Sequence, residues 1–599
     1  MNKIVRSVTK KIIDRSKKYR EKYLSQMIGN KDSISDRSSI SCGNIAHAIA
    51  GCSKADKNAL SDNEINNIGI VTAYNDMLSA HKTYENYPEI IRNFARKYNC
   101  VAQVSSGVPA MCDGVTQGEP GMDLSLFSRD VIALSTVIGL SHNVYNSIIC
   151  LGICDKIVPG LLIGALKFGH LPTIFVPGGP MQTGISNELK AKYRKDFAKG
   201  LISKKELLKA ESKSYHSEGT CTFYGTANSN QMLMEIMGIQ LPGSSFVNPN
   251  NKLRLLLTEY SVKLSKKISE KGRNYIPLFN VINEKSIVNA IIGLLSTGGS
   301  TNHTIHLIAI AKAAGIQITW NDFSELSSVV PLLLKIYPNG SLDVNHFHDA
   351  GGMPFLIQEL LNAEILHNDV NTILGNNLYD FTKFPSIINS ELKWENSSEK
   401  SKNPSILRTF SNPFSNNGGI KVLNGNLGKS IIKISSVKKE HLIITAPIII
   451  FEEQHELISS FQKNNLNKDF IAVLRFQGPK AKGMPELHKL TPILSILLNN
   501  GYKVALITDG RMSGASGRVP AAIHLSPEAM DGGLLSKLID GDIVTLDATK
   551  GILNCHNEEI ISLRKQKKYN NYQENCGREL FNNFKKTITS SDEGASILF

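Results

Sequence analysis

Apolar residues follow two spacings along the first two thirds of the chain. Short runs rich in β-branched residues, at 67–72, 147–153 and 173–177, predict strands. The stretches 126–140 and 300–315 carry apolar residues at helical spacing and predict helices. Strands alternating with helices predict an α/β domain with a largely parallel sheet, which we bound at residues 65–390.

The pattern changes towards the C-terminus. Residues 391–418 are rich in Ser, Asn and Pro and are predicted to form an exposed linker. Strand-like runs then follow one another with few helices between them, so residues 419–599 are predicted to form a β-rich, barrel-like domain. Residues 1–64 are predicted to form a helical extension, to which the sequence assigns no role.

Composition narrows the classes of function. The 599 residues are 41% hydrophobic and 20% charged, as in ordinary multidomain globular proteins. The net charge of +14 indicates an acidic partner, but much of the excess lies near the two chain ends, which favours a small anionic substrate over a nucleic acid. No apolar window is long enough for a membrane span or a signal peptide. The nine cysteines are odd in number and lack C-x-x-C spacing, so reduced thiols and a cytoplasmic location are expected.

Three unlike side chains follow the predicted strand 147–153, namely Cys154, Asp155 and Lys156. Ligands gather beyond the carboxyl ends of parallel strands, so this is a candidate site. A second thiol, Cys221, lies in a loop rich in Gly, Ser, Thr and Asn, whose donors can hydrogen-bond to the sulfurs of an iron–sulfur cluster. Taken alone, each thiol is also explained as an ordinary buried residue.

Carboxylates supply a second, harder set of candidate ligands. Asp113 lies in a turn-rich loop, Asp155 follows a strand, and Glu452 ends the apolar run 446–451. Oxygen ligands of this kind suit Mg²⁺ or Mn²⁺. An isolated Asp in a loop is usually a capping or turn residue.

The glycine-rich loop after the strand-like run 504–508 carries Arg511, Ser513 and Arg518. Its arginines suit a carboxylate or phosphate, and Ser513 is a possible reacting hydroxyl, although a flexible surface loop explains the composition equally well. His303 and His306 lie one helical turn apart without an H-E-x-x-H context, so zinc is not expected there.

Taken together and in this order, four segments resemble the sugar-acid and dihydroxyacid dehydratase family: CDKIVPG (154–160), GTCTFYGTANSNQ (219–231), GGSTNHT (298–304) and TDGRMSGASG (508–517). The segments GVPAMCDGVTQGEPGM (107–122) and GPKAKGMPELHKL (478–490) are most similar to the branch that acts on 6-phosphogluconate. The resemblance runs from about residue 65 to the C-terminus.

The resemblance implies an iron–sulfur hydro-lyase that also needs a divalent metal. It implies Cys154 and Cys221 as cluster ligands, with Cys112 as a candidate third ligand. The Mg²⁺ or Mn²⁺ ligands that it implies are Asp113, Asp155 and Glu452.

Two further roles follow from the resemblance, a carbamate on Lys156 and a general base at Ser513. Relatives with a [2Fe–2S] centre carry another cysteine in the segment matching 75–81, and this chain has none there. The branch that acts on 6-phosphogluconate is associated with a [4Fe–4S] cluster, so the resemblance implies [4Fe–4S] here, with [2Fe–2S] as the alternative. The candidate groups for a substrate phosphate or carboxylate are Arg511, Arg518, Lys480, Lys482 and His81.

The implied activity is dehydration of 6-phospho-D-gluconate to 2-dehydro-3-deoxy-6-phospho-D-gluconate in the Entner–Doudoroff pathway, by a homodimer that uses neither nucleic acid nor membrane as a partner. The alternative within the family is a dihydroxyacid dehydratase or another sugar-acid dehydratase. The alternative of another class is a non-catalytic sugar-phosphate binder whose cysteines are core residues.

Overall fold

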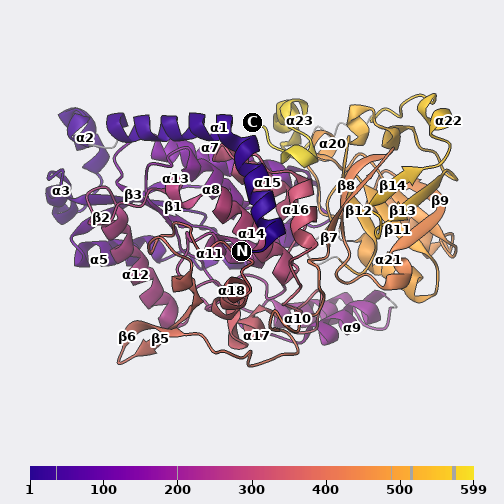
Figure 1. Cartoon of the computed structure of the whole chain (residues 1–599), viewed down its shortest axis with the longest axis horizontal. Helices are drawn as coiled ribbons and strands as arrows, with labels where there is room; N and C mark the ends of the chain where they lie inside the picture. Colours follow the sequence, from indigo (N-terminus) through magenta and orange to yellow (C-terminus); the bar gives the residue numbers. More distant parts are fainter. Residues whose placement is uncertain (35–36, 199, 488, 513–516, 570–574) are drawn as a thin grey trace.

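The computed structural model describes residues 1–599 except 35–36, 199, 488, 513–516 and 570–574. An α/β part, built from about the first two thirds of the chain, lies beside a β-barrel (Figure 1). Helix α1 (Lys3–Ile34) runs along one edge of the α/β part, and the chain's last residues return from the barrel to that part. The two parts therefore share an interface to which both chain halves contribute.

A four-stranded parallel sheet forms the centre of the α/β part, in the order β2-β1-β3-β4. Its strands are β1 (Asn66–Thr72), β2 (Cys100–Gly107), β3 (Ser147–Leu151) and β4 (Thr173–Phe175). β1 and β3 are buried along their whole length, as expected for strands that are covered on both faces. Because the strands are parallel, their carboxyl ends lie at one edge, and the loop after β3 begins there.

Helices surround the sheet and fill the rest of the α/β part (Figure 1). They are α2 (Cys42–Ile49), α3 (Lys54–Leu60), α4 (Ser79–Lys82), α5 (Tyr87–Lys97), α6 (Asp113–Thr116), α7 (Ser125–Leu140), α8 (Ile157–Leu166), α9 (Asn187–Ala198), α10 (Lys204–Ser214), α11 (Thr226–Ile236), α12 (Lys252–Ile268), α13 (Leu278–Val281), α14 (Glu284–Thr297), α15 (His303–Ala313), α16 (Trp320–Ser327), α17 (Val344–Asp349) and α18 (Gly352–Asn362).

Eight strands close the barrel in the order β10-β11-β12-β8-β7-β14-β13-β9. They are β7 (Ile420–Gly425), β8 (Gly428–Lys433), β9 (Ile443–Phe451), β10 (Phe470–Leu474), β11 (Val504–Thr508), β12 (Ala521–Ser526), β13 (Ile543–Asp547) and β14 (Ile552–Cys555). The accompanying helices are α19 (Gln454–Gln462), α20 (Pro479–Lys482), α21 (Leu490–Asn499), α22 (Glu558–Ser562) and α23 (Asn582–Thr587). β9, β10 and β11 run parallel, so their carboxyl ends also gather at one rim.

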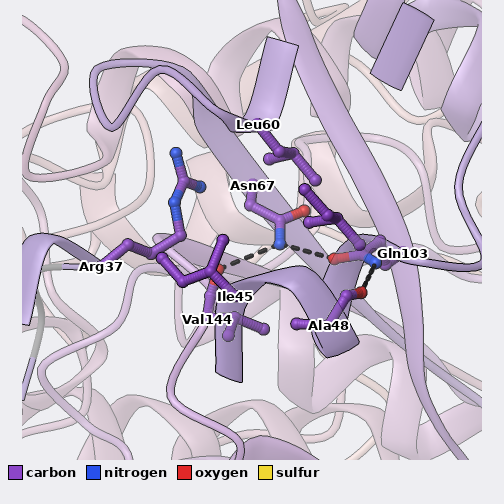
Figure 2. Close-up of a pocket in the computed structure, with 8 residues that line it drawn as sticks. Arg37, Ile45, Ala48, Leu60, Asn67, Gln103 and Val144 are labelled. Atoms are coloured by element: carbon purple, nitrogen blue, oxygen red, sulfur yellow. Dashed lines mark hydrogen bonds between the residues drawn. The ribbon is translucent and has the colours of Figure 1, made fainter. Parts of the chain in front are cut away.

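The N-terminal helices attach to the sheet through buried amides (Figure 2). The Asn67 side-chain amide donates to Gln103 Oε1 (2.7 Å) and to the Val144 carbonyl (3.0 Å), and Gln103 donates to the Ala48 carbonyl in α2 (2.9 Å). The adjoining cavity measures only about 10 Å³, roughly the room for one water. This region is therefore a packed joint rather than a ligand site.

Basic residues of α1 are partly used inside the molecule. The Arg20 guanidinium donates to the carbonyl oxygens of Ala314 (2.7 Å) and Ile282 (2.8 Å), and Arg15 pairs with Asp322. These contacts hold α1 against the α/β part. Part of the positive charge near the N-terminus is thus used in contacts within the molecule.

The structure confirms the predicted fold class, a parallel α/β part followed by a barrel. The strands predicted at 67–72, 147–153 and 173–177 correspond to β1, β3 and β4. The stretch predicted as a linker is not wholly irregular, because it begins with β6 (Glu391–Asn396), which pairs with β5 (Lys383–Ile388) as a hairpin. The domain boundaries stay predictions. Among the described residues no helix combines the length and apolarity that a membrane crossing requires.

Two glycines let α8 lie close against α7. A Cβ on Gly160 would lie 2.5 Å from the Arg129 carbonyl oxygen, and one on Gly164 would lie 2.6 Å from Thr136 Cβ. Real side chains do not approach that closely, so a larger residue would push the helices apart. Since α8 begins directly after Lys156, this packing also positions the loop that precedes it.

We expect Gly164→Ala to destabilise the protein by about 1–3 kcal/mol through overpacking between α7 and α8. Gly29→Ala is the matched control, because Gly29 is also helical and nothing lies within 4 Å of its added Cβ. The stability of the Gly29→Ala protein should be unchanged or slightly raised. Thermal unfolding of both variants checks this, and equal melting temperatures would contradict the close packing.

Candidate active site

The loop between β3 and α8 carries Cys154, Asp155 and Lys156 to the carboxyl edge of the sheet, as predicted. Cys154 has φ of 75°, a left-handed conformation that costs a non-glycine residue about 1–3 kcal/mol. The side chains of Cys154 and Lys156 are buried, with Lys156 completely so. Surrounding contacts must therefore hold this strained turn.

Three carboxylates meet beside this loop. Oxygens of Asp113, Asp155 and Glu486 all lie within 4.8 Å of one another. Asp113 begins α6, Asp155 follows β3, and Glu486 follows the short helix α20 in the C-terminal half of the chain. We call these three residues the carboxylate triad. It draws on both parts of the molecule, and its oxygen atoms are of the type that Mg²⁺ and Mn²⁺ prefer.

Two buried cations compensate the triad. Lys156 Nζ contacts Asp113 Oδ2 and lies 3.0 Å from Asp155 Oδ2. Arg511 donates to Asp113 (2.7 Å) and Asp155 (3.2 Å), and its guanidinium lies 3.7 Å from Glu486. When all three carboxyl groups are ionised, three negative and two positive charges leave one net negative charge, which favours an additional cation or a proton.

The charges act differently on two of the carboxyl groups. Burial alone would raise the pKa of Asp155, but Lys156, the His306 hydrogen bond and Arg511 hold that pKa well below its usual range. For Glu486, burial dominates over Arg511, and together with the two Asp charges it raises the pKa to about 7. A metal ion would replace the proton that this buried site otherwise favours on Glu486.

Neutral groups orient the two aspartates. His306 Nε2 lies 3.1 Å from Asp155 Oδ1, and burial lowers the pKa of His306 to about 4, so the ring is neutral near pH 7. Ser125 donates to Asp113 Oδ1 at 2.6 Å. The sequence suggested no zinc at His303 and His306, and the structure gives His306 a contact with the triad instead.

Three thiols gather next to the triad. Burial, followed by the charges of Cys112 and Cys221, raises the pKa of Cys154, and burial with Cys112 raises the pKa of Cys221 to about 12. The three sulfurs are thus close enough for their charges to interact. Sulfurs around an iron–sulfur cluster need such mutual proximity, and thiolates are the ligands that these clusters use.

Helix α11 holds the two cysteine loops together. It begins at Thr226, five residues after Cys221. Asn228 Nδ2 donates to the carbonyl oxygens of Cys221 (2.7 Å) and Phe223 (2.8 Å). Two residues further along the same helix, Asn230 Nδ2 donates to the carbonyl oxygens of Cys154 and Asp155, both at 2.9 Å. These amides are buried and tie the thiol loops to one rigid element.

A pocket of about 200 Å³ is lined by residues of both parts of the molecule. It lies between the segment after α6, the carboxyl ends of β9 and β10, and the segment before Glu486, which contributes Pro485. Its cations are Lys482, paired with Glu453, and Arg578, paired with Asp123 at 3.0 Å. It has room for a small anionic group.

Two family models match the chain. The dihydroxy-acid/6-phosphogluconate dehydratase N-terminal model matches residues 66–381, and the C-terminal model of the same family matches residues 405–595. The chain belongs to the dihydroxy-acid/6-phosphogluconate dehydratase family.

Named relatives span nearly the whole chain. It is 53% identical over 599 residues to a phosphogluconate dehydratase of Rhizobium meliloti, covering 99% of both chains. It is 50% identical to the Escherichia coli K12 phosphogluconate dehydratase, covering 100% of both. A dihydroxy-acid dehydratase of Campylobacter fetus is 32% identical over 88% of this chain and 93% of its own. The chain is thus more similar to the first two relatives than to the third.

The family resemblance had suggested Glu452 as the third metal ligand, and the structure does not bring it to the triad. Its carboxylate lies 3.3 Å from Arg475 and 3.9 Å from Lys567. Glu486 takes the third position. The sequence reasoning missed Glu486, although it lies in the segment 478–490 that carried the resemblance. No local pattern marked it, because its role arises from contact with a distant part of the chain.

The predicted anion-binding residues do not form one group. Arg511 lies among the carboxylates, where its guanidinium nitrogens donate to Met484, Asp155, Asp113 and Ser125. His81 is fully buried, burial lowers its pKa to about 4, and its Nδ1 bonds to the Ala73 carbonyl, so it supplies no positive charge. Lys480 pairs with Asp531, and Arg518 is exposed.

Of these candidates, Lys482 lines the pocket, together with Arg578, which sequence reasoning missed. Ser513 lies outside the described residues, so its predicted role as a base stays a prediction.

If the triad binds a divalent cation, Mn²⁺ should bind to metal-free protein, and Glu486→Gln should weaken that binding by about tenfold or more because one anionic ligand is lost. Glu452→Gln is the matched control and should bind Mn²⁺ as the unmodified chain does. Loss of the free-Mn²⁺ electron paramagnetic resonance signal during titration measures both. A larger effect of Glu452→Gln than of Glu486→Gln would contradict the placement.

Proposed function

We propose that the chain is a hydro-lyase that removes water from 6-phospho-D-gluconate and yields 2-dehydro-3-deoxy-6-phospho-D-gluconate. The observation that carries this proposal is that two Cys–Asp pairs bring a set of thiols and a set of carboxylates to adjacent positions. Cys112 adjoins Asp113, and Cys154 adjoins Asp155, so each pair offers a thiol to one group and a carboxylate to the other. Neighbouring reacting carbons of a sugar acid need two such adjacent sites.

The reaction removes a proton from C2 and hydroxide from C3. The C2 proton is weakly acidic beside an ionised carboxylate, and hydroxide is a poor leaving group. A divalent cation at the triad and an iron–sulfur cluster at the thiols would supply Lewis acidity to the acid end and to the C3 hydroxyl. The residues fit both groups. The carboxylates lie within 4.8 Å of one another and, when all three are ionised, carry a net negative charge with their two cations. Cys112, Cys154 and Cys221 offer the thiols that a cluster needs, and their charges interact.

The chain's own side chains would orient the reacting groups. Asp113, Asp155 and Glu486 fix the cation, and Arg511 limits their mutual repulsion. Lys156 is fully buried against two carboxylates, where a carbamate would replace its positive charge by another anionic oxygen ligand. Ser513 follows Arg511 by two positions in the sequence and remains the candidate base for the C2 proton.

The pocket beside Pro485 is the proposed position of the phosphate end. Lys482 and Arg578 supply positive charge there. Lys482 pairs with Glu453 and Arg578 with Asp123, and a bound phosphate would replace these carboxylates as the partner of each cation. Burial raises the pKa of Asp123 despite three nearby cations, Lys482, Arg578 and Lys585, which favours its protonation beside an anion.

The proposed cluster is [4Fe–4S], held by Cys112, Cys154 and Cys221, with [2Fe–2S] as the alternative form. A homodimer is the expected assembly. Cys100 begins β2 and Cys150 lies within β3, so both are buried residues of the central sheet.

Protein purified without oxygen should contain iron and sulfide, and Cys112→Ser, Cys154→Ser and Cys221→Ser should each lose most of both because a ligand is missing. Cys150→Ala is the control, since Cys150 is a buried thiol within β3, the strand that precedes Cys154. Iron and sulfide analysis with an absorption spectrum measures the result. Wild-type iron content in Cys112→Ser would remove it from the ligand set, and a colourless unmodified protein would favour the non-catalytic binder.

The anaerobic protein should turn over 6-phospho-D-gluconate faster than gluconate or 2,3-dihydroxyisovalerate. Lys482→Met should raise KM for the phosphorylated substrate by about 10–100-fold, because a charge-assisted contact is lost. Lys480→Met is the matched control on the same helix, and its KM should not change. Exclusive turnover of dihydroxyisovalerate would overturn the proposed substrate, and equal KM values in the two lysine variants would overturn the phosphate position.

A further inference from the structure

The chain's C-terminal residues lie against the helix that supports the carboxylate triad. Ala595 and Ser596 are fully buried, although they are within five residues of the C-terminus. Gly594 packs on α15, where an added Cβ would lie 3.0 Å from the Ala309 backbone nitrogen. Ile588 and Ala595 join an apolar cluster with Leu126 of α7. We call residues 594–597 the C-terminal tail.

Two adjacent residues of α7 bind the tail through its backbone. Arg129 donates to the carbonyl oxygens of Gly594 (3.0 Å) and Ala595 (2.6 Å). Asp130 Oδ2 accepts from the Ser596 hydroxyl (2.9 Å) and the Ile597 backbone N–H (2.8 Å). Both side chains are buried, and Arg129 also donates to Asp130 Oδ1 at 2.9 Å. The tail thus determines where the guanidinium lies.

The same guanidinium reaches His306. Arg129 Nη1 lies 3.4 Å from His306 Nδ1. A guanidinium donates hydrogen bonds and cannot accept them, so Nδ1 must be the unprotonated nitrogen of the ring. The proton of the neutral imidazole is then on Nε2, which lies 3.1 Å from Asp155 Oδ1 and donates to it. Arg129 therefore selects the tautomer that can hold Asp155.

Both oxygens of Asp155 are held by different partners. Oδ2 faces the cations Lys156 (3.0 Å) and Arg511 (3.2 Å), whereas Oδ1 faces His306. The histidine contact therefore limits rotation of the carboxylate. Groups that orient a metal ligand in this way commonly change metal affinity by 10–100-fold when they are removed.

We propose that the C-terminal tail acts through Arg129 and His306 as a positioning device that fixes the Asp155 carboxylate for metal binding. Arg129 and His306 are positioning residues in this arrangement, since neither is placed among the metal ligands. The inference rests on the proposed metal site at the triad. It predicts that the last residues of the chain, supplied after the barrel, influence metal affinity at the edge of the N-terminal sheet.

Mn²⁺ titration of metal-free, full-length protein by electron paramagnetic resonance tests the proposal. His306→Phe should weaken Mn²⁺ binding by about 10-fold or more, because Phe fills the space without a donor. His306→Gln should recover much of the affinity, since its amide can donate to Asp155. Arg129→Gln, and a chain that ends at Glu593, should weaken binding in the same direction. His367→Phe is the control, because His367 is buried but its Nε2 bonds to Thr9.

The double variants separate positioning from general destabilisation. If the tail and Arg129 act through His306, adding either change to His306→Phe should weaken Mn²⁺ binding little further. Independent, additive losses would contradict the proposed path, as would wild-type affinity in His306→Phe and Arg129→Gln. If Arg129→Gln does not fold, the tail deletion carries the same test.

The two proposals fail differently. Failure of the unmodified protein to bind Mn²⁺ would overturn the metal site and the inference together. Normal binding by the unmodified protein, loss in Glu486→Gln and no loss in the His306 and tail variants would overturn the inference alone.

Discussion

Repulsion among the three closely spaced carboxylates of the triad is the constraint on which the site depends. Two unit charges 4.8 Å apart repel by about 3–4 kcal/mol at an effective dielectric constant near 20. Arg511 and Lys156 offset this repulsion, one from the segment after β11 and the other from the loop after β3. The Arg511 contacts with Asp113 and Asp155 also join the barrel to the α/β part. Formation of the triad is therefore coupled to the docking of the two parts.

This arrangement also explains the order of residues in the loops. A Cys–Asp pair on each of two loops directs a soft and a hard ligand to adjacent positions, and a third carboxylate comes from the C-terminal half. Asn228 and Asn230 fix the thiol loops through backbone carbonyls, so the side chains of the loops stay available. A rigid framework of buried amides and charges is what a site needs when its ligands come from distant segments.

Much of the fold could be predicted from periodicity. β1, β3 and β4 are short apolar runs between turn residues, and α7 and α15 carry apolar residues at helical spacing. The candidate site was predictable where function coincides with a strand end, as at Cys154 and Asp155. Glu486 was not, because it follows a four-residue helix and becomes a triad member only when the barrel meets the sheet. Arg511 was predicted to bind a phosphate or carboxylate of the substrate, because it is a basic residue in a glycine-rich loop. Its actual partners, the three carboxylates of the triad, come from distant segments that the local sequence does not reveal. The contact of Arg129 with the tail spans more than 460 positions, beyond any local pattern.

The central claim is that a hard-metal site and a cluster site adjoin at the interface of the two parts. Anomalous X-ray diffraction from crystals of anaerobically prepared, Mn²⁺-loaded protein tests it most directly, because the iron and manganese absorption edges are separable. The account predicts a manganese peak among Asp113, Asp155 and Glu486 and an iron peak beside Cys112, Cys154 and Cys221. Manganese at Glu452, or iron away from these thiols, would contradict it.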